Sequence, residues 1–319
     1  MLPELSSVDS VHLAFDKNNL FVLEIVLGFV MFGVALDLRV DDFRTLGRSP
    51  KAPGIGLVCQ FLLLPALTWA LSRLLVTVGL IPPSMALGMI LVAACPGGNI
   101  SNFITHLGGG RTTTSIGMTA VSTLASMIMT PLNFALWGSM SPDTAAILEE
   151  VAMDPLGMFR AVMFMLGIPI TVGVFLATRW PKVAKKLHPL FKRLSLLFFV
   201  TFIVMAVRAN FDDFMTYLPL VFLPVLIMNA FALALGFYVA RLSGLDQADQ
   251  RAVSIEVGIQ NSGLGLILIF SFFEGLGGMA IIAAWWGIWH ILAGLSLAGL
   301  WVRKDRRAEA AEQAEAGAA

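Results

Sequence analysis

Apolar residues fall into nine stretches, separated by short segments that hold most of the polar positions. Each stretch is close to the ~20 residues that a helix needs to cross the hydrocarbon of a bilayer. The runs are continuous, whereas the strands of a membrane β-barrel alternate apolar and polar positions. We therefore expect an all-α polytopic membrane protein with nine transmembrane helices. Their approximate ranges are 19–38, 52–77, 82–106, 112–138, 158–178, 190–208, 214–240, 248–273 and 279–302.

Composition supports this class. Of the 319 residues, 57% are hydrophobic and only 13% are charged, whereas a soluble chain carries about a quarter charged residues. The basic residues lie in short loops, and no basic domain exists that would bind nucleic acid. We expect a monomer embedded in the lipid bilayer.

The positions of lysine and arginine orient the predicted helices. One side, which receives the loops 39–51 and 179–193 and the C-terminal tail, carries 17 of the 21 basic residues. Cytoplasmic loops are enriched in these residues, so we expect the N-terminus outside and the C-terminus in the cytoplasm. The membrane would be the plasma membrane, or the inner membrane in a bacterium. The charged tail at 303–319 is expected to be cytoplasmic, solvated and partly disordered.

Two of the apolar stretches are interrupted, the third at 95–102 and the eighth at 256–265. Proline removes a helical hydrogen bond, and glycine weakens a helix interior. The two interrupted stretches are the third and the eighth of the nine. Because they are separated by an odd number of stretches, five, they cross the membrane in opposite directions. Broken helices at matching positions of two inverted halves are typical of the binding site of a secondary transporter. We infer an inverted repeat of five-helix units, in which the N-terminal unit lacks its first helix.

Glu256, in the second interruption, is the only acidic residue well inside any apolar stretch. A charge at that depth costs roughly 2.5–3.5 kcal/mol even on lenient insertion scales. Gln260 lies one turn further along, and unwinding would free the carbonyls of Val257 and Ile259. Such an all-oxygen set favours a hard cation over a soft metal. The alternative is a neutral, structural carboxyl group that is hydrogen-bonded to a neighbouring helix.

Hydroxyl and amide side chains near the first interruption fit the same chemistry. Ser101 and Asn102 can cap the second half-helix, or they can turn their oxygens toward a cation. Without a site, Pro96 would be an ordinary kink with caps. One face of the next stretch carries hydroxyl groups, which can serve as ligands or mediate helix packing. These residues are Ser115, Thr119, Ser122, Ser126 and Thr130, and packing is favoured for the last two.

Three other polar side chains lie alone within apolar stretches: Gln60, Asn229 and His290. A lone amide in a membrane helix is usually an interhelical hydrogen-bonding group. His290 either faces a cavity or bonds to a neighbouring helix.

Residues 96–102 and 256–263 resemble the two signature motifs of the bile acid:sodium symporter family, and the similarity extends from about residue 19 to 302. The resemblance implies a single transporter unit in its nine-helix form, with two unwound helices that cross. The core domain would comprise about 52–138 and 214–302, and the panel domain about 19–38 and 158–208.

The resemblance also implies two sodium sites that share Glu256. The first would use Ser101, Asn102, Ser115, Thr119 and Glu256. The second would use Gln60, Glu256, Gln260 and the backbone carbonyls of Val257 and Ile259. Family positions implicated in substrate binding correspond to Asn99, Asn261 and His290. Ile291 stands where relatives often have asparagine, so bile acid itself is not assumed as the substrate.

We therefore expect sodium-coupled symport of an organic anion, bile-acid-like or a small carboxylate, by alternating access. Sodium would be the coupling ion, with no other cofactor and no enzymatic activity. The main alternative is a sodium/proton or other cation antiporter, although such carriers usually need a titrating aspartate or paired acids at the crossing. An intramembrane enzyme that uses His290 and a serine lacks a recognisable nucleophile motif. A sensor without transport activity is a further alternative.

Overall fold

The computed structural model describes residues 50–151, 154–209 and 211–318, together with Val8, Ile25, Gly28, Phe29, 31–33, Ala35 and Leu36. The elements of this part are helices. Five helical spans in it are long and apolar enough to cross a membrane: Lys51–Thr77, Thr112–Ser139, Pro155–Arg179, Met215–Leu242 and Gly277–Ala316. The predicted all-α, polytopic class is confirmed. Most of the predicted stretch at 19–38 lies outside the described residues.

The first described span is a helix with a widened turn in its middle. It consists of α4 (Lys51–Val58), a π-helical turn η1 (Cys59–Leu63) and α5 (Leu64–Thr77). Pro65 has no N–H to donate to the preceding turn, and its ring would collide with a carbonyl there. The π-helical turn absorbs this mismatch, and it carries Gln60. The same device recurs before Pro169, in α10 (Pro155–Val162), η2 (Met163–Gly167) and α11 (Ile168–Arg179).

Two spans are broken, as predicted. The first consists of α6 (Pro83–Ala94) and α7 (Ile100–Leu107), and the second of α14 (Gln247–Gly258) and α15 (Ser262–Phe272). α6 and α15 have 12 and 11 residues, so each extends less than ~20 Å, against ~30 Å of hydrocarbon. Pro96 holds Cys95 in an extended conformation (φ −69°, ψ 158°), which ends α6. The second break is narrower than the predicted 256–265, because only 259–261 leave the helix.

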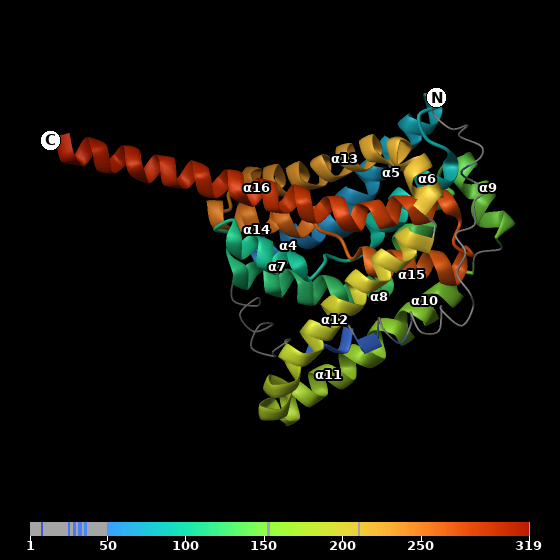
Figure 1. Cartoon of the computed structure of the whole chain (residues 1–319), viewed down its shortest axis with the longest axis horizontal. Coiled ribbons are helices and arrows are strands. Elements are labelled where there is room, and N and C mark those ends of the chain that lie inside the picture. Colours follow the sequence, from blue (N-terminus) through green and yellow to red (C-terminus); the bar gives the residue numbers. More distant parts are fainter. Residues whose placement is uncertain are drawn as a thin grey trace.

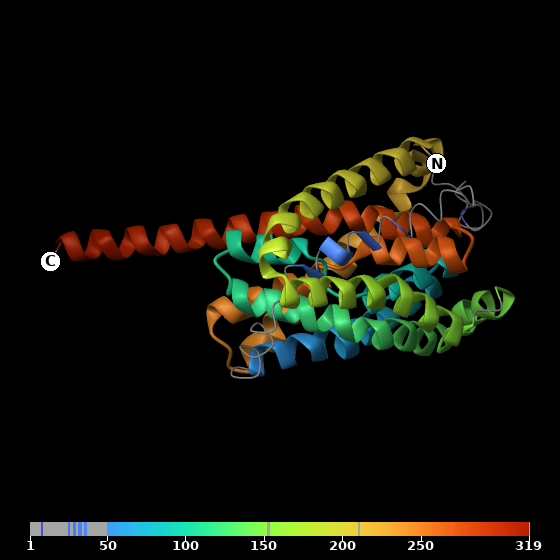
Figure 2. The same cartoon turned by 90° about the horizontal axis from the view of Figure 1, so that it is seen from below.

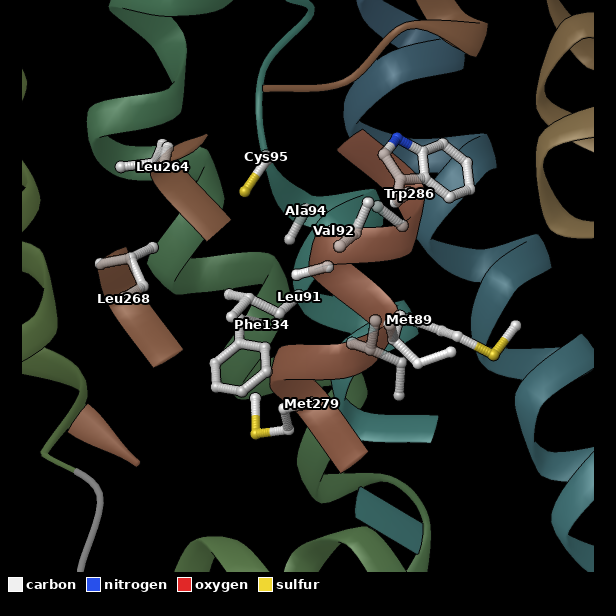
Figure 3. Close-up of a cluster of buried hydrophobic side chains, with 14 of the residues drawn as sticks. Met89, Leu91, Val92, Ala94, Cys95, Phe134, Leu264, Leu268, Met279 and Trp286 are labelled. Atoms are coloured by element: carbon white, nitrogen blue, oxygen red, sulfur yellow. The ribbon is translucent and has the colours of Figure 1, made fainter. Parts of the chain in front are cut away.

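α6 is the centre of the apolar core. Every side chain from Ser84 to Ala94 is buried, which marks a helix surrounded by other helices. Figure 3 shows Met89, Leu91 and Val92 of α6 beside residues of α8 (Thr112–Ser139), α15 and α16 (Gly277–Ala318). α16 comes so close that a Cβ at Gly88 would lie 2.8 Å from the Cα of Met279. Small residues permit this kind of contact between membrane helices.

The remaining helices are α8 (Thr112–Ser139), α9 (Pro142–Glu150), α12 (Pro181–Ala209), α13 (Phe211–Leu242) and α16 (Gly277–Ala318). α10, α11 and α12 flank one side of the bundle, and α16 projects well beyond it at the C-terminal end (Figures 1 and 2). The prediction of a partly disordered tail was wrong, because α16 continues through it as an exposed helix. Alanine, glutamate and arginine in this tail favour helix. α9 was not predicted, since its nine residues are too few to span a membrane.

A buried arginine of α14, Arg251, joins this helix to α7 and α16 near the end of the bundle from which α16 projects. Arg251 of α14 is 3% exposed, and its Nη1 donates a hydrogen bond to the carbonyl of Gly108, at the end of α7, over 3.0 Å. Nη1 and Nη2 lie 2.6 and 2.7 Å from the two carboxylate oxygens of Asp305 on α16. The ring of Trp301 lies 5.4 Å from the guanidinium carbon. Arg251 therefore joins the ends of both broken spans to α16.

The Asp305→Asn substitution should destabilise this junction. Arg251 holds the pKa of Asp305 below its usual range, so the ion pair stabilises the fold above about pH 4 and is lost as the pH falls further. Because Asp305 is partly exposed, we expect a loss of only about 1 kcal/mol at pH 7. The variant should also lack the acid-dependent step of the wild type. Thermal unfolding of the purified protein between pH 3 and 8 measures both effects. The exposed Glu309→Gln on the same helix is the control, and equal unfolding of both variants at pH 7 would contradict the prediction.

Candidate functional site

The two unwound segments bind each other through their backbones. The N–H of Gly98 donates to the carbonyl of Ile259 over 2.8 Å, and the N–H of Asn261 donates to that of Pro96 over 2.8 Å. Gly97 and Gln260 face each other across this antiparallel pair. A lipid environment offers no water to backbone groups freed by unwinding. Each break therefore supplies the hydrogen-bonding partners that the other lacks.

Glu256 lies beside this pair and is 2% exposed. Ser101 Oγ donates to its Oε2 over 2.6 Å, and Thr119 Oγ1 lies 2.9 Å from both carboxylate oxygens. Ser115 Oγ is 3.4 Å from Oε2. The structure thus brings together residues of α7, α8 and α14 that lie far apart in sequence.

Asn102 completes the same cluster. Its Oδ1 accepts from Ser115 Oγ over 2.8 Å and from Thr119 Oγ1 over 3.2 Å. Each hydroxyl has one proton, whereas the carboxylate and the amide oxygen together offer several lone pairs. Among the ion pairs of the described residues, none includes Glu256. A buried carboxylate without a cationic partner, surrounded by neutral oxygens, suits a hard cation such as sodium.

Gly97 makes room for the carboxylate. A Cβ at this position would lie 2.1 Å from Glu256 Oε1 and 2.8 Å from its carboxyl carbon. Gly98 is equally restricted, because a Cβ there would lie 2.9 Å from the carbonyl oxygen of Gln260. A side chain at Gly97 would therefore displace the carboxylate, and one at Gly98 would collide with the backbone of the other break.

The amides of Gln60 and Gln260 form a second polar cluster. Gln60 Nε2 lies 2.7 Å from Gln260 Oε1, and Gln260 Nε2 lies 3.2 Å from Gln60 Oε1. Gln60 Nε2 also donates to the carbonyl of Cys95, and Gln260 Nε2 to that of Val257, each over 2.7 Å. The carbonyl of Ile259 is engaged by Gly98, as described above. The residues predicted for the second sodium site thus lie together, but the amides bond to each other.

No described hydrogen bond joins the side chains of the three predicted substrate residues, Asn99, Asn261 and His290. Asn99 is exposed at the start of α7, with no side-chain hydrogen bond to cap it. Asn261 caps α15, because its Oδ1 accepts from the N–H of Leu264 over 3.1 Å. His290 is 3% exposed and meets the ring of Trp286 edge-on. One turn beyond His290, a Cβ at Gly294 would lie 3.0 Å from Ile259, so α16 passes close to the crossing.

Sequence reasoning missed one member of the carboxylate cluster. Thr105 is fully buried, and its hydroxyl donates to Ser115 Oγ over 3.3 Å. It lies four residues after Ser101, on the same face of α7. That spacing is the signal which could have identified it.

The hydroxyl-bearing face of α8 serves two purposes. Only Ser115 and Thr119 reach Glu256, as the preceding distances show. Ser122 and Ser126 bond to carbonyls of their own helix. Thr130 Oγ1 donates over 2.7 Å to the carbonyl of Ala94, the last residue of α6. It thereby satisfies one of the carbonyls left free where that helix ends.

Comparison with known proteins adds independent information. The sequence profile of the Sodium Bile acid symporter family matches residues 24–217. The Uncharacterized sodium-dependent transporter YocS of Bacillus subtilis is 34% identical over 290 residues, which cover 90% of this chain and 85% of that protein. An alignment of that extent includes Glu256, whereas the profile match ends before it.

Two further relatives come from eukaryotes. The Probable sodium/metabolite cotransporter BASS1, chloroplastic, of Arabidopsis thaliana is 31% identical over 87% of this chain and 66% of its own length. The Ileal sodium/bile acid cotransporter of Cricetulus griseus is 29% identical over 76% of this chain and 67% of its own length. The prediction of a transporter rather than an enzyme is confirmed by these relatives.

The Gly97→Ala substitution tests the geometry of the carboxylate cluster. The added methyl group cannot coexist with Glu256 in its present position, so we expect the half-saturating sodium concentration to rise at least about tenfold. The measurement is the shift in the thermal unfolding midpoint of the purified protein as sodium replaces potassium at constant ionic strength.

Gly265→Ala provides the matched control. A Cβ at this buried position of α15 would meet only ordinary contacts, the nearest being Cys95 Sγ at 3.7 Å. It should respond to sodium as the wild type does. An unchanged sodium response in Gly97→Ala would show that Glu256 takes no part in binding the cation.

Proposed function

Since this chain belongs to the sodium bile acid symporter family, we propose that it couples sodium influx to the uptake of an organic anion by alternating access. The observation that carries the proposal is the buried carboxylate of Glu256, which three hydroxyl groups contact and which no described basic side chain pairs with. A bound sodium ion would neutralise this charge at a depth where water cannot.

The first sodium ion would bind within the carboxylate cluster, which consists of Ser101, Asn102, Ser115, Thr119 and Glu256. Their oxygens already converge in the structure, and α7, α8 and α14 each contribute at least one. The second ion would use Gln60, Gln260, Glu256 and the carbonyls of Val257 and Ile259. Since the two amides bond to each other, they would have to turn their oxygens toward the ion as it binds.

We further propose nine membrane spans built as an inverted repeat. The reciprocal pairing of the two breaks supports this arrangement: the N–H of Gly98 donates to the residue before Gln260, and the N–H of Asn261 donates to the residue before Gly97. The core would contain both broken spans with their neighbours, and the panel would contain 19–38 and 158–208. The distribution of basic residues supports an external N-terminus and a cytoplasmic C-terminus in the plasma membrane. We expect the unit to work as a monomer.

The substrate would bind between core and panel, near Asn99, Asn261 and His290. α7 and α15 both begin at the crossing, and helix N-termini attract anions. Two of the named relatives are, by their names, a bile acid cotransporter and a probable metabolite cotransporter, and an organic carboxylate fits both. Ile291 stands where relatives often have asparagine, so bile acid itself is not assumed as the substrate. Two sodium ions moving with one monoanion would carry one net charge, which gains about 2.3 kcal/mol per 100 mV.

An antiporter of similar fold is less well supported. Such carriers usually place a second acid at the crossing, and the described hydrogen bonds of Glu256 involve only hydroxyl groups. The neutral ligands are better suited to holding sodium than to exchanging it for a proton.

Uptake into proteoliposomes tests the proposed symport. We expect an inward sodium gradient to drive accumulation of a radiolabelled bile acid or small carboxylate, and an inside-negative potential to increase it. Glu256→Gln, which keeps the size and removes the charge, should lower sodium-driven uptake by at least about a hundredfold because both ions use this residue. Glu274→Gln, at the turn after α15, is the control. Equal uptake in sodium and potassium, or full coupling in Glu256→Gln, would refute the proposal.

A further inference from the structure

Asn229 of α13 holds the end of α14. Its side chain is fully buried, and Nδ2 donates to the carbonyl of Gly258 over 2.7 Å. Gly258 is the last residue of α14, and the last carbonyls of a helix have no partner within it. Among the described residues, this is the side-chain hydrogen bond that links α13 to the carbonyl of Gly258, at the edge of the unwound segment.

Three successive carbonyls at this end of α14 have three different donors. Val257 accepts from Gln260 Nε2 over 2.7 Å, Gly258 from Asn229 Nδ2, and Ile259 from the N–H of Gly98 over 2.8 Å. Neighbouring peptide planes share a Cα, so fixing the middle carbonyl restricts the rotation of the other two. By holding the carbonyl of Gly258, Asn229 thereby directs the two carbonyls on either side of it, those of Val257 and Ile259. Both were proposed above as sodium ligands.

Gln60 occupies the corresponding place at the other break. It donates to the carbonyl of Cys95 over 2.7 Å. Cys95 lies two residues before Gly97, and Gly258 lies two residues before Gln260, the residue that faces Gly97. In both halves, a carboxamide from the span preceding the broken helix holds the carbonyl at the same position.

The surroundings of Asn229 indicate a requirement other than stability. Its Oδ1 is buried and has no hydrogen-bonding partner among the described residues, an arrangement that is unfavourable compared with an apolar side chain of the same shape. α13 and α14 are also in close contact, because a Cβ at Gly236 would lie 2.7 Å from the carbonyl oxygen of Val253. The donor is therefore held firmly against α14.

We propose that Asn229 is a positioning residue for sodium binding, the counterpart of Gln60 in the second half of the fold. It acts through the backbone of 257–259 and does not itself contact the ion. This inference rests on the proposed sodium coupling.

The test compares two variants with one control in the purified full chain. Asn229→Leu keeps the volume and removes the donor, and Asn229→Ser leaves a hydroxyl too short to span the same distance. Asn133→Leu is the control, because Asn133 is also buried but its side chain bonds within α8, to Met129 and Trp137. Sodium chloride is titrated against potassium chloride, and the thermal unfolding midpoint is recorded.

Binding stabilises the folded state in proportion to the logarithm of the sodium concentration divided by the dissociation constant. Both Asn229 variants should therefore need about tenfold more sodium than the wild type for the same rise in the midpoint. The control should alter the midpoint in potassium but not the sodium concentration needed for a given rise in the midpoint. If Asn229→Leu does not fold, Asn229→Ser carries the comparison. A sodium affinity within about twofold of the control would overturn the inference. A wild type that gives no response to sodium would instead refute the sodium coupling on which it rests.

Discussion

A helix that unwinds at membrane depth exposes backbone groups that neither water nor lipid can satisfy. In this protein the two breaks solve that problem jointly, through the hydrogen bonds from Gly98 to Ile259 and from Asn261 to Pro96. Side chains from the surrounding helices satisfy the remaining carbonyls: Thr130 that of Ala94, Gln60 that of Cys95, and Asn229 that of Gly258. Neither break would be stable without the other, so the crossing is a single structural unit.

The position of Glu256 follows from this unit. The carboxylate approaches Gly97, a residue of the opposite break, so closely that any larger residue there would displace it. Hydroxyl groups of α7 and α8 then converge on it from two further helices. A cation bound in this cluster would contact three helices at once. Its binding energy would therefore depend on their relative placement, which is the property that a coupling ion needs.

Sequence predicted these features unevenly, for physical reasons. Pro96 and the glycines locate the breaks because they act on their own backbone, and Glu256 is conspicuous because an acid is rare inside an apolar stretch. The spacing of Ser115, Thr119, Ser122, Ser126 and Thr130 places them on one face of α8, but only three-dimensional packing decides that the first two reach Glu256. The roles of Thr105 and Asn229 depend on contacts with distant segments. α9 and the helical tail form because their residues favour helix locally. A pattern of hydropathy does not detect such helices.

The arrangement also explains how sodium could favour an anion although, among the described residues, no basic side chain pairs with Glu256. A bare carboxylate would repel an anion placed near the N-termini of α7 and α15, and a sodium ion removes that repulsion. A unit charge at ~10 Å and an effective dielectric constant of ~20 contributes ~2 kcal/mol, which is of the size typical for coupling between two ligands. By linkage, the anion would strengthen sodium binding by the same factor. In the proposed mechanism, electrostatics at Glu256 would therefore be sufficient to couple sodium to the anion, and the helix N-termini would need only to orient the substrate.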